Sequence, residues 1–244
     1  LSLGYNILLF PLAYLYSALE EKNIFDWIGA IIGFSMILIA GSRGPFLAVA
    51  IFALIYVMLK ISNSRKRVVL MLSVVLGFIL LWVLYPFIIM WLSNLLEQLG
   101  LSSRFLTKLM AGDIFDDTGR NRIWGAAVEM IRSNPFGYGA MGSRPVMYNY
   151  VYAAHPHQIF LEILIDFGVF IGSAIIIWML IYSLKVFRMR GQDEWRGVFL
   201  IFFARACQLL ISVTFWHSIG LWGTVAVGYC ALRARKRGTI HGRE

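Results

Sequence analysis

The chain has 244 residues, of which 59% are hydrophobic and only 14% are charged. An average soluble domain is about 45–50% apolar and about 25% charged, so the composition excludes an ordinary soluble domain and indicates an all-α polytopic membrane protein. The net charge of +9 does not indicate nucleic-acid binding, because the basic residues gather beside apolar runs, where the positive-inside rule explains them.

Seven apolar runs approach or reach the length that crosses a bilayer, which is about 20 residues with a range of about 17–25. They cover residues 3–19, 24–40, 45–59, 68–91, 157–184, 197–213 and 216–232. The longest polar interval, residues 92–156, separates the fourth run from the fifth. We therefore predict one membrane domain of about seven transmembrane helices, with residues 92–156 as an extracytoplasmic cap.

Three basic clusters fix the predicted topology. They lie at Lys60–Arg67, Lys185–Arg190 and Arg233–Arg237. Placing them inside puts the N-terminus outside, the C-terminus inside, and both Gly41–Pro45 and the cap outside. The turn at Glu20–Asn23 must then lie inside, although its own charge does not predict that side.

The two cysteines, Cys207 and Cys230, lie in apolar runs and have no metal-site spacing. They imply no disulfide framework. The sequence opens at Leu1 inside an apolar run, with neither an initiator Met nor a signal-peptide pattern, so we expect it to be the later part of a longer protein.

Two helices are predicted in the cap. The first follows Ser102 or Ser103 and has an apolar face at Phe105, Leu106, Leu109 and Met110. The second is amphipathic, with apolar residues at Ile123, Trp124, Ala127, Val128 and Ile131. Arg120 lies at its N-terminus, and Asn134-Pro135 ends it.

Gly137–Gly142 has the letters of a dinucleotide-binding loop, Gly-x-Gly-x-x-Gly. That assignment needs a preceding strand in a βαβ unit, whereas here the motif follows the end of a helix. We predict a glycine-permitted turn. A second hypothesis is that its backbone amides face an anion.

Arg43, Arg120 and Arg122 are candidate anion contacts. Arg43 lies in a tight break between two runs, where it can either reach lipid headgroups or bind an anion. The predicted topology places all three arginines outside. Planar guanidinium groups match phosphate oxygens bidentately, so several of them around one pocket would suit a pyrophosphate.

His155-Pro156-His157-Gln158 opens the fifth run. A histidine at the mouth of a membrane site suits a general base, because its pKa lies near the working pH. The two histidines also suggest a metal, but no cysteine and no Glu-x-x-His pattern accompanies them, so zinc is not favoured.

Gln158, Glu162 and Asp166 repeat every four residues and so share one helix face. Ionisable groups inside a span are paired or functional by default. Arg205 in the sixth run lies at a depth similar to that of Asp166. We predict a buried Asp166–Arg205 pair with a structural role.

Three pieces of the sequence resemble the bacterial O-antigen ligase and O-antigen polymerase superfamily. They are Gly41-Ser42-Arg43-Gly44-Pro45, then Thr118-Gly119-Arg120 with Trp124 and Asn134–Gly139, and His155–Glu162. Their order and spacing agree over about residues 30–180. One departure is Gln158, which stands where the family usually has Asn.

The resemblance implies a membrane enzyme that takes a glycan from an undecaprenyl-pyrophosphate carrier at the outer face of the bacterial inner membrane. The acceptor would be lipid A-core for a ligase and a carrier-linked glycan for a polymerase. It implies that Arg43 and Arg120 hold the pyrophosphate and that His157 orients or deprotonates the acceptor hydroxyl. Arg122, His155 and Gln158 are the further candidate substrate contacts. No metal, nucleotide or other cofactor is implied.

A transporter or flippase for an anionic lipid or sugar is the alternative function. Transporters place ionisable residues near the bilayer midplane, where Asp166 and Arg205 are predicted. The two functions differ in where the essential charges lie, at the outer mouth or at the midplane.

Overall fold

The computed structural model of the chain describes residues 2–39, 44–98, 119–189 and 193–241. All regular structure in these ranges is helical, as predicted. The helices are α1 (Ser2–Ile7), α2 (Leu9–Glu21), α3 (Ile24–Ile39), α4 (Gly44–Lys60), α5 (Ser64–Gln98), α7 (Arg120–Ser133), α8 (Ser143–Met147), α9 (Ile159–Phe187), α10 (Asp193–Cys207) and α11 (Ile219–His241). Two short 3-10 turns, η1 (Gln208–Leu210) and η2 (Phe215–His217), join α10 to α11.

One helix in the described ranges, Ile159–Phe187, is long and apolar enough to cross a membrane by itself. Two shorter apolar helices cover Ile24–Ile37 and Leu47–Lys60. Each of the seven predicted runs overlaps a helical segment, but seven spans remain a prediction. Helix α5 continues past the predicted start of the polar interval at residue 92 and ends at Gln98. The predicted helix after Ser102 lies outside the described residues.

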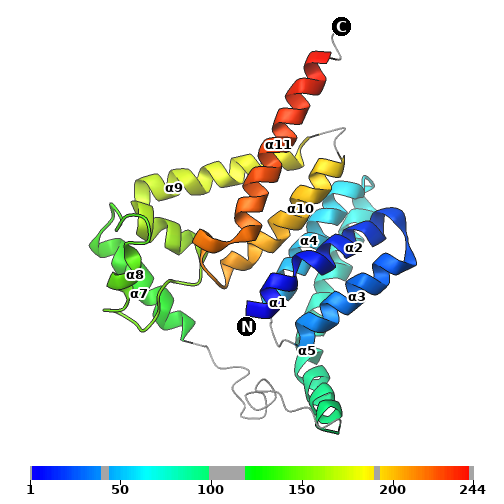
Figure 1. Cartoon of the computed structure of the whole chain (residues 1–244), viewed down its shortest axis with the longest axis horizontal. Helices are drawn as coiled ribbons and strands as arrows, with labels where there is room; N and C mark the ends of the chain where they lie inside the picture. The colour runs from blue at the N-terminus through cyan, green and yellow to red at the C-terminus, as the bar shows by residue number, and fades with distance from the viewer. Residues whose placement is uncertain (1, 40–43, 99–118, 190–192, 242–244) are drawn as a thin grey trace.

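The helices before and after the cap pack into one bundle (Figure 1). Leu12 of α2, Phe52 of α4 and Leu200 of α10 are fully or almost fully buried in a shared core. A second core joins the end of α9 to α10 and α11 through Val186, Phe199 and Ala231. The C-terminal helices therefore complete a bundle that the N-terminal helices begin.

The Glu20–Asn23 turn lies beside the first basic cluster. Lys60 forms an ion pair with Glu20, with 2.8 Å between Nζ and Oε2. The Tyr56 hydroxyl donates to the other carboxylate oxygen of Glu20 at 3.0 Å. The charge of the turn does not predict on which side of the membrane the turn lies. The contact ties the turn to the end of α4 that the predicted topology places inside.

Helix α9 changes direction at Gly168, whose backbone is non-helical with φ 75° and ψ 171° (Figure 1). The first part of α9 packs against α7 and α8, where Ala127, Met147 and Ile165 share a core. The fifth predicted span, residues 157–184, is thus not one straight helix. The part before Gly168 packs on the cap helices and also on the α10–α11 connection, where Ile159 and Ile163 share a core with Leu209 and Phe215.

Candidate functional site

The amphipathic helix predicted from Asn121 is confirmed as α7. Ile123, Ala127 and Met130 are buried on one face, so the 3.6-residue period brings that face onto the cap core. Arg120 is the first residue of the helix, as predicted. The helix ends at Asn134, whose backbone N–H donates to the Met130 carbonyl.

The segment after α7 forms backbone hydrogen bonds with α9 at the point where α9 is interrupted. The backbone N–H groups of Tyr138 and Gly139 donate to the carbonyls of Ile165 and Asp166, both at 2.9 Å. In the opposite direction, the Val169 N–H donates to the Pro135 carbonyl at 2.8 Å. The break leaves these groups of α9 without helical partners, and buried backbone groups must be paired. The cap turn supplies the partners.

Two glycines make this close approach possible. A Cβ atom on Gly137 would lie 2.6 Å from the Asp166 carbonyl oxygen, and one on Gly168 would lie 2.7 Å from the Pro135 carbonyl oxygen. Both residues also have positive φ, which glycine adopts without strain. The prediction of a glycine-permitted turn is confirmed. The anion hypothesis is wrong for Tyr138 and Gly139, because both amides bond to α9.

His155 and His157 lie together at the start of α9, with ring centroids 4.1 Å apart. Both are half-buried. The Trp124 indole N–H donates to the carbonyl of Pro156, the residue between them, at 3.1 Å. His157 has a left-handed backbone with φ 55°, which is uncommon for a side-chain-bearing residue. The histidine turn is therefore anchored to α7 and turned sharply before the helix.

Burial keeps both imidazoles neutral. Burial, then the neighbouring His157 and Arg144, lower the pKa of His155 to about 4. Burial, followed by the charge of Arg120, lowers the pKa of His157. An arginine of the cap contributes to each lowered pKa, Arg144 for His155 and Arg120 for His157. An unprotonated imidazole beside a fixed guanidinium can accept a proton while the cation holds an anion.

Arg144, on α8, is a residue of the site that was not predicted from the sequence. Its Nε atom and the Nε2 atom of His155 are both buried, and neither has a hydrogen-bond partner among the described residues. Buried polar atoms are normally bonded. A polar ligand or a water molecule at each atom would supply the missing hydrogen bond.

The side chain of Gln158 has a structural contact at the start of α9, and its predicted contact with substrate stays a prediction. Its side-chain oxygen accepts the Leu161 backbone N–H at 2.6 Å and so caps α9. Asparagine is a preferred residue for this role, so the departure from Asn keeps the function of the position.

Glu162 and Asp166 share one face of α9, as predicted, and both are buried. Glu162 accepts the Thr214 hydroxyl at 2.5 Å and the Phe215 N–H at 3.2 Å. Asp166 accepts the Ser143 hydroxyl and, at 2.9 Å, the Trp216 indole N–H. Arg205 is buried too, and its pairing with Asp166 stays a prediction. The two carboxylates tie α8, α9 and the η2 segment together.

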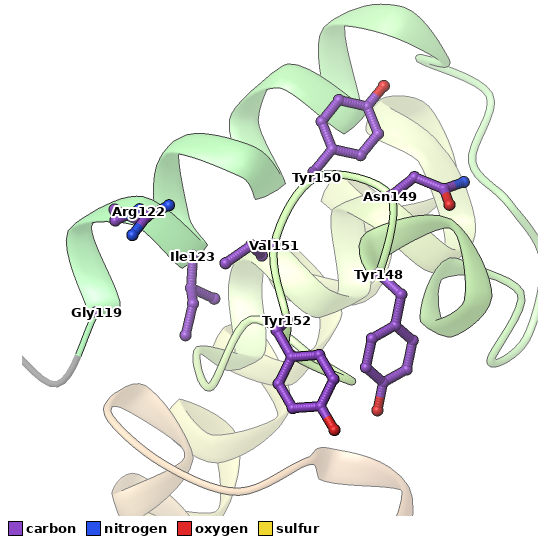
Figure 2. A pocket seen from close by; sticks show the side chains of 8 residues that line it. All are labelled: Gly119, Arg122, Ile123, Tyr148, Asn149, Tyr150, Val151 and Tyr152. Carbon is purple, nitrogen blue, oxygen red and sulfur yellow. The ribbon is translucent and has the colours of Figure 1, made fainter.

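A hollow of about 410 Å³ opens beside the first turn of α7. Arg122 and Ile123 form one side, and the Tyr148–Tyr152 loop forms the other (Figure 2). Arg122 is exposed there, so its predicted position near Arg120 at the mouth of the site is consistent with ligand contact.

Arg43 lies outside the described residues, so its convergence with Arg120 and His157 stays a prediction. Within the described ranges, no group of three or more His, Cys, Asp or Glu side chains is arranged to hold a metal ion. The arrangement that the structure does describe is two neutral imidazoles, two arginines and a capped helix start.

The family model described as O-antigen ligase matches residues 28–177 of the chain. The chain belongs to the O-antigen ligase family. No curated protein and no solved structure matches it significantly. Members of the O-antigen ligase family are bacterial membrane proteins that act on lipid-linked glycans.

Membership of the O-antigen ligase family accounts for most of the site but not for all of it. The matched residues include α7, α8 and the histidine turn. Thr214 and Trp216, which bond the two carboxylates of α9, lie beyond the match. No spacing pattern in the sequence indicates these partners, because Thr214 is 52 residues away from Glu162.

Proposed function

We propose that the protein joins a glycan from an undecaprenyl-pyrophosphate carrier to an acceptor hydroxyl, as an O-antigen ligase or polymerase. The observation that carries the proposal is the 3.1 Å hydrogen bond from the Trp124 indole of α7 to the Pro156 carbonyl. It ties the helix that begins at Arg120 to the turn that holds His157. A cation for a leaving pyrophosphate and a base for an incoming hydroxyl are thus carried by two segments that contact each other.

In the proposed reaction, the acceptor oxygen attacks the anomeric carbon of the donor sugar. The new C–O bond forms as the bond from that carbon to the pyrophosphate oxygen breaks. His157 takes the hydroxyl proton, and undecaprenyl pyrophosphate leaves with its negative charge stabilised by Arg120 and Arg43. Arg122, His155 and Arg144 contribute further substrate contacts, and Gln158 positions the start of α9. The reaction as proposed uses no metal and no nucleotide.

The proposed setting is the bacterial inner membrane, with seven spans and the cap on the periplasmic side. The contact of Trp216 with Asp166 supports it. The topology assigns the α10–α11 connection and the cap to the same side, and this bond joins them. Asp166 and Arg205 then have structural roles within the bundle.

The acceptor would be lipid A-core for a ligase and a carrier-linked glycan for a polymerase. Deletion of the gene distinguishes a ligase from a polymerase, because a different lipid-linked intermediate accumulates in each case. Full-length glycans on the carrier indicate a ligase, and single repeats on the carrier indicate a polymerase.

Alanine substitutions test the proposal in membranes that contain the donor and the acceptor. Arg120→Ala and His157→Ala are expected to abolish joining while the carrier-linked donor still reaches the outer face. Arg132→Ala is the matched control, because Arg132 is exposed at the other end of α7 and should leave joining unchanged. Intact joining in Arg120→Ala, or loss of donor at the outer face in Asp166→Asn, would instead favour a transporter.

A further inference from the structure

The hollow beside α7 has an unusual lining of tyrosines. Tyr148, Tyr150 and Tyr152 contribute to it, together with Asn149 and Val151 of the same loop. Figure 2 shows the side chains of Tyr148 and Tyr152 pointing to the same side of the loop. These tyrosines are 51%, 45% and 95% exposed, in chain order. A cluster of exposed aromatic side chains commonly marks a binding surface.

The loop that presents the tyrosines is held by its own backbone. The N–H groups of Tyr150 and Val151 both donate to the Met147 carbonyl, at 3.0 Å and 2.9 Å. Met147 is fully buried, and Val151 packs against the cap core. Alternation along the loop thus turns Val151 inward and leaves its two tyrosine neighbours outward. The aromatic surface is preorganised, which lowers the entropic cost of binding a ligand.

We propose that this hollow binds sugar residues of the glycan, an inference that rests on the proposed function. A sugar ring has an apolar C–H face, which packs on an aromatic ring, and a rim of hydroxyl groups. Tyrosine offers both an apolar face and a polar hydroxyl. Asn149 and Arg122 add donors and an acceptor along the rim. The hollow is within the common size range of ligand pockets, about 300–1,000 Å³.

The place of the hollow favours the donor glycan. Gly119 and Arg122 line it and flank Arg120 on the first turn of α7. Successive helix residues rise by about 1.5 Å, so Arg122 lies about 3 Å along the axis from Arg120. Residues two apart on a helix face different sides, but Gly119 at the N-terminal end of α7 also lines the hollow. A glycan whose pyrophosphate is held by Arg120 would therefore pass over the N-terminal end of α7 to enter the hollow.

Binding of soluble glycans to the full chain in detergent tests the inference. The first probe is the oligosaccharide released by mild acid from the carrier lipid, and the second is the core oligosaccharide released from lipid A. Tyr152→Leu should raise the Kd of the bound probe by about fivefold to tenfold. Tyr152→Trp, which keeps an aromatic face, should largely retain binding. Tyr229→Leu is the control, because Tyr229 is equally an exposed tyrosine, on α11.

An effect confined to the carrier glycan assigns the hollow to the donor, and one confined to the core oligosaccharide assigns it to the acceptor. An unchanged Kd for both probes in Tyr152→Leu and Tyr148→Leu overturns the inference. The tyrosines would then be membrane-interface anchors if the same variants lose activity only in bilayers. The Arg120→Ala variant distinguishes failure of this inference from failure of the proposed function. It should lose joining activity while it still binds the free glycan.

Discussion

At the scale of single residues, the site depends on two imidazoles that stay neutral. Burial is the main cause of the lowered pKa in both, and each also faces an arginine of the cap. Protonation of either histidine would add a third positive charge to a region that already holds Arg120 and Arg144. That charge would be repelled by the two arginines. A bound anionic donor offsets the repulsion, because its negative charge compensates the proton that the histidine accepts.

The pH dependence of joining follows from the direction of the His157 shift. Because the pKa of His157 lies below its usual 6.5, the base is already unprotonated at neutral pH. We expect kcat/KM to remain constant as the pH falls from 8 to 6.5 and to decline only below that value. The measurement is the initial rate of joining at low donor concentration across this range. An acid limb centred above pH 7 would contradict the assignment of His157 as the base.

Gln158 offers a residue-scale test of the helix cap. Gln158→Ala removes the acceptor for the Leu161 N–H and should lower the free energy of unfolding by about 1 kcal/mol. Gln158→Asn restores a side chain suited to the role and should match or exceed the original stability. Thermal unfolding in detergent measures both, with Asn149→Ala as an exposed control. Equal stability of all variants would show that the cap contributes nothing.

At the scale of elements, the joint between α9 and the cap turn decides where the site lies. The break at Gly168 exposes the Ile165 and Asp166 carbonyls, and the turn at Tyr138 and Gly139 covers them. The histidines precede the same stretch of α9 by about two turns. The joint therefore sets the distance between the proposed base and the helix α7 that holds Arg120.

Glycine substitutions test this joint. Gly168→Ala and Gly137→Ala bring a Cβ atom against the facing backbone and force a strained φ. Strain of this kind costs about 1–3 kcal/mol before any clash is counted, so both variants should unfold at lower temperature and lose joining. Gly125→Ala is the matched control, because its Cβ meets open space on helix α7 and should be neutral or slightly stabilising. Equal unfolding temperatures would contradict the close approach.

The sequence predicted local features of this region better than long-range ones. The apolar period from Ile123 and the Asn134-Pro135 stop predicted α7 because helix formation follows local spacing. The spacing of Glu162 and Asp166 predicted their shared face but not Ser143, Thr214 or Trp216 as partners. Those contacts depend on tertiary packing, and so does the break at Gly168, which lies in an otherwise continuous apolar run.

At the scale of the whole molecule, two contacts agree with the predicted topology. Glu20 binds Lys60 at one end of the bundle, and Trp216 binds Asp166 beside the cap. The positions of the basic clusters predicted which end of the bundle lies inside. The charge of the Glu20–Asn23 turn did not predict its side, and the ion pair with Lys60 places the turn at that same end. The seven predicted spans rest on apolar length in the sequence, and α9 alone among the described helices meets that criterion in the structure.

Cysteine labelling tests the topology. Cys207 and Cys230 are first replaced by Ala, and single cysteines are then placed at Tyr152 in the cap and at Arg65 in the first basic cluster. A membrane-impermeant maleimide on intact cells should label position 152 and leave position 65 unlabelled until the membrane is opened. Labelling of position 65 in intact cells would reverse the orientation.

The most direct test of the proposed transfer is product stoichiometry in proteoliposomes that contain purified protein, carrier-linked donor and acceptor. Joined glycan and released undecaprenyl pyrophosphate should appear in a one-to-one ratio, without added nucleotide. His157→Gln should slow both products together by about 10²–10⁴-fold. Movement of intact donor across the bilayer without release of undecaprenyl pyrophosphate would contradict glycan transfer as the function.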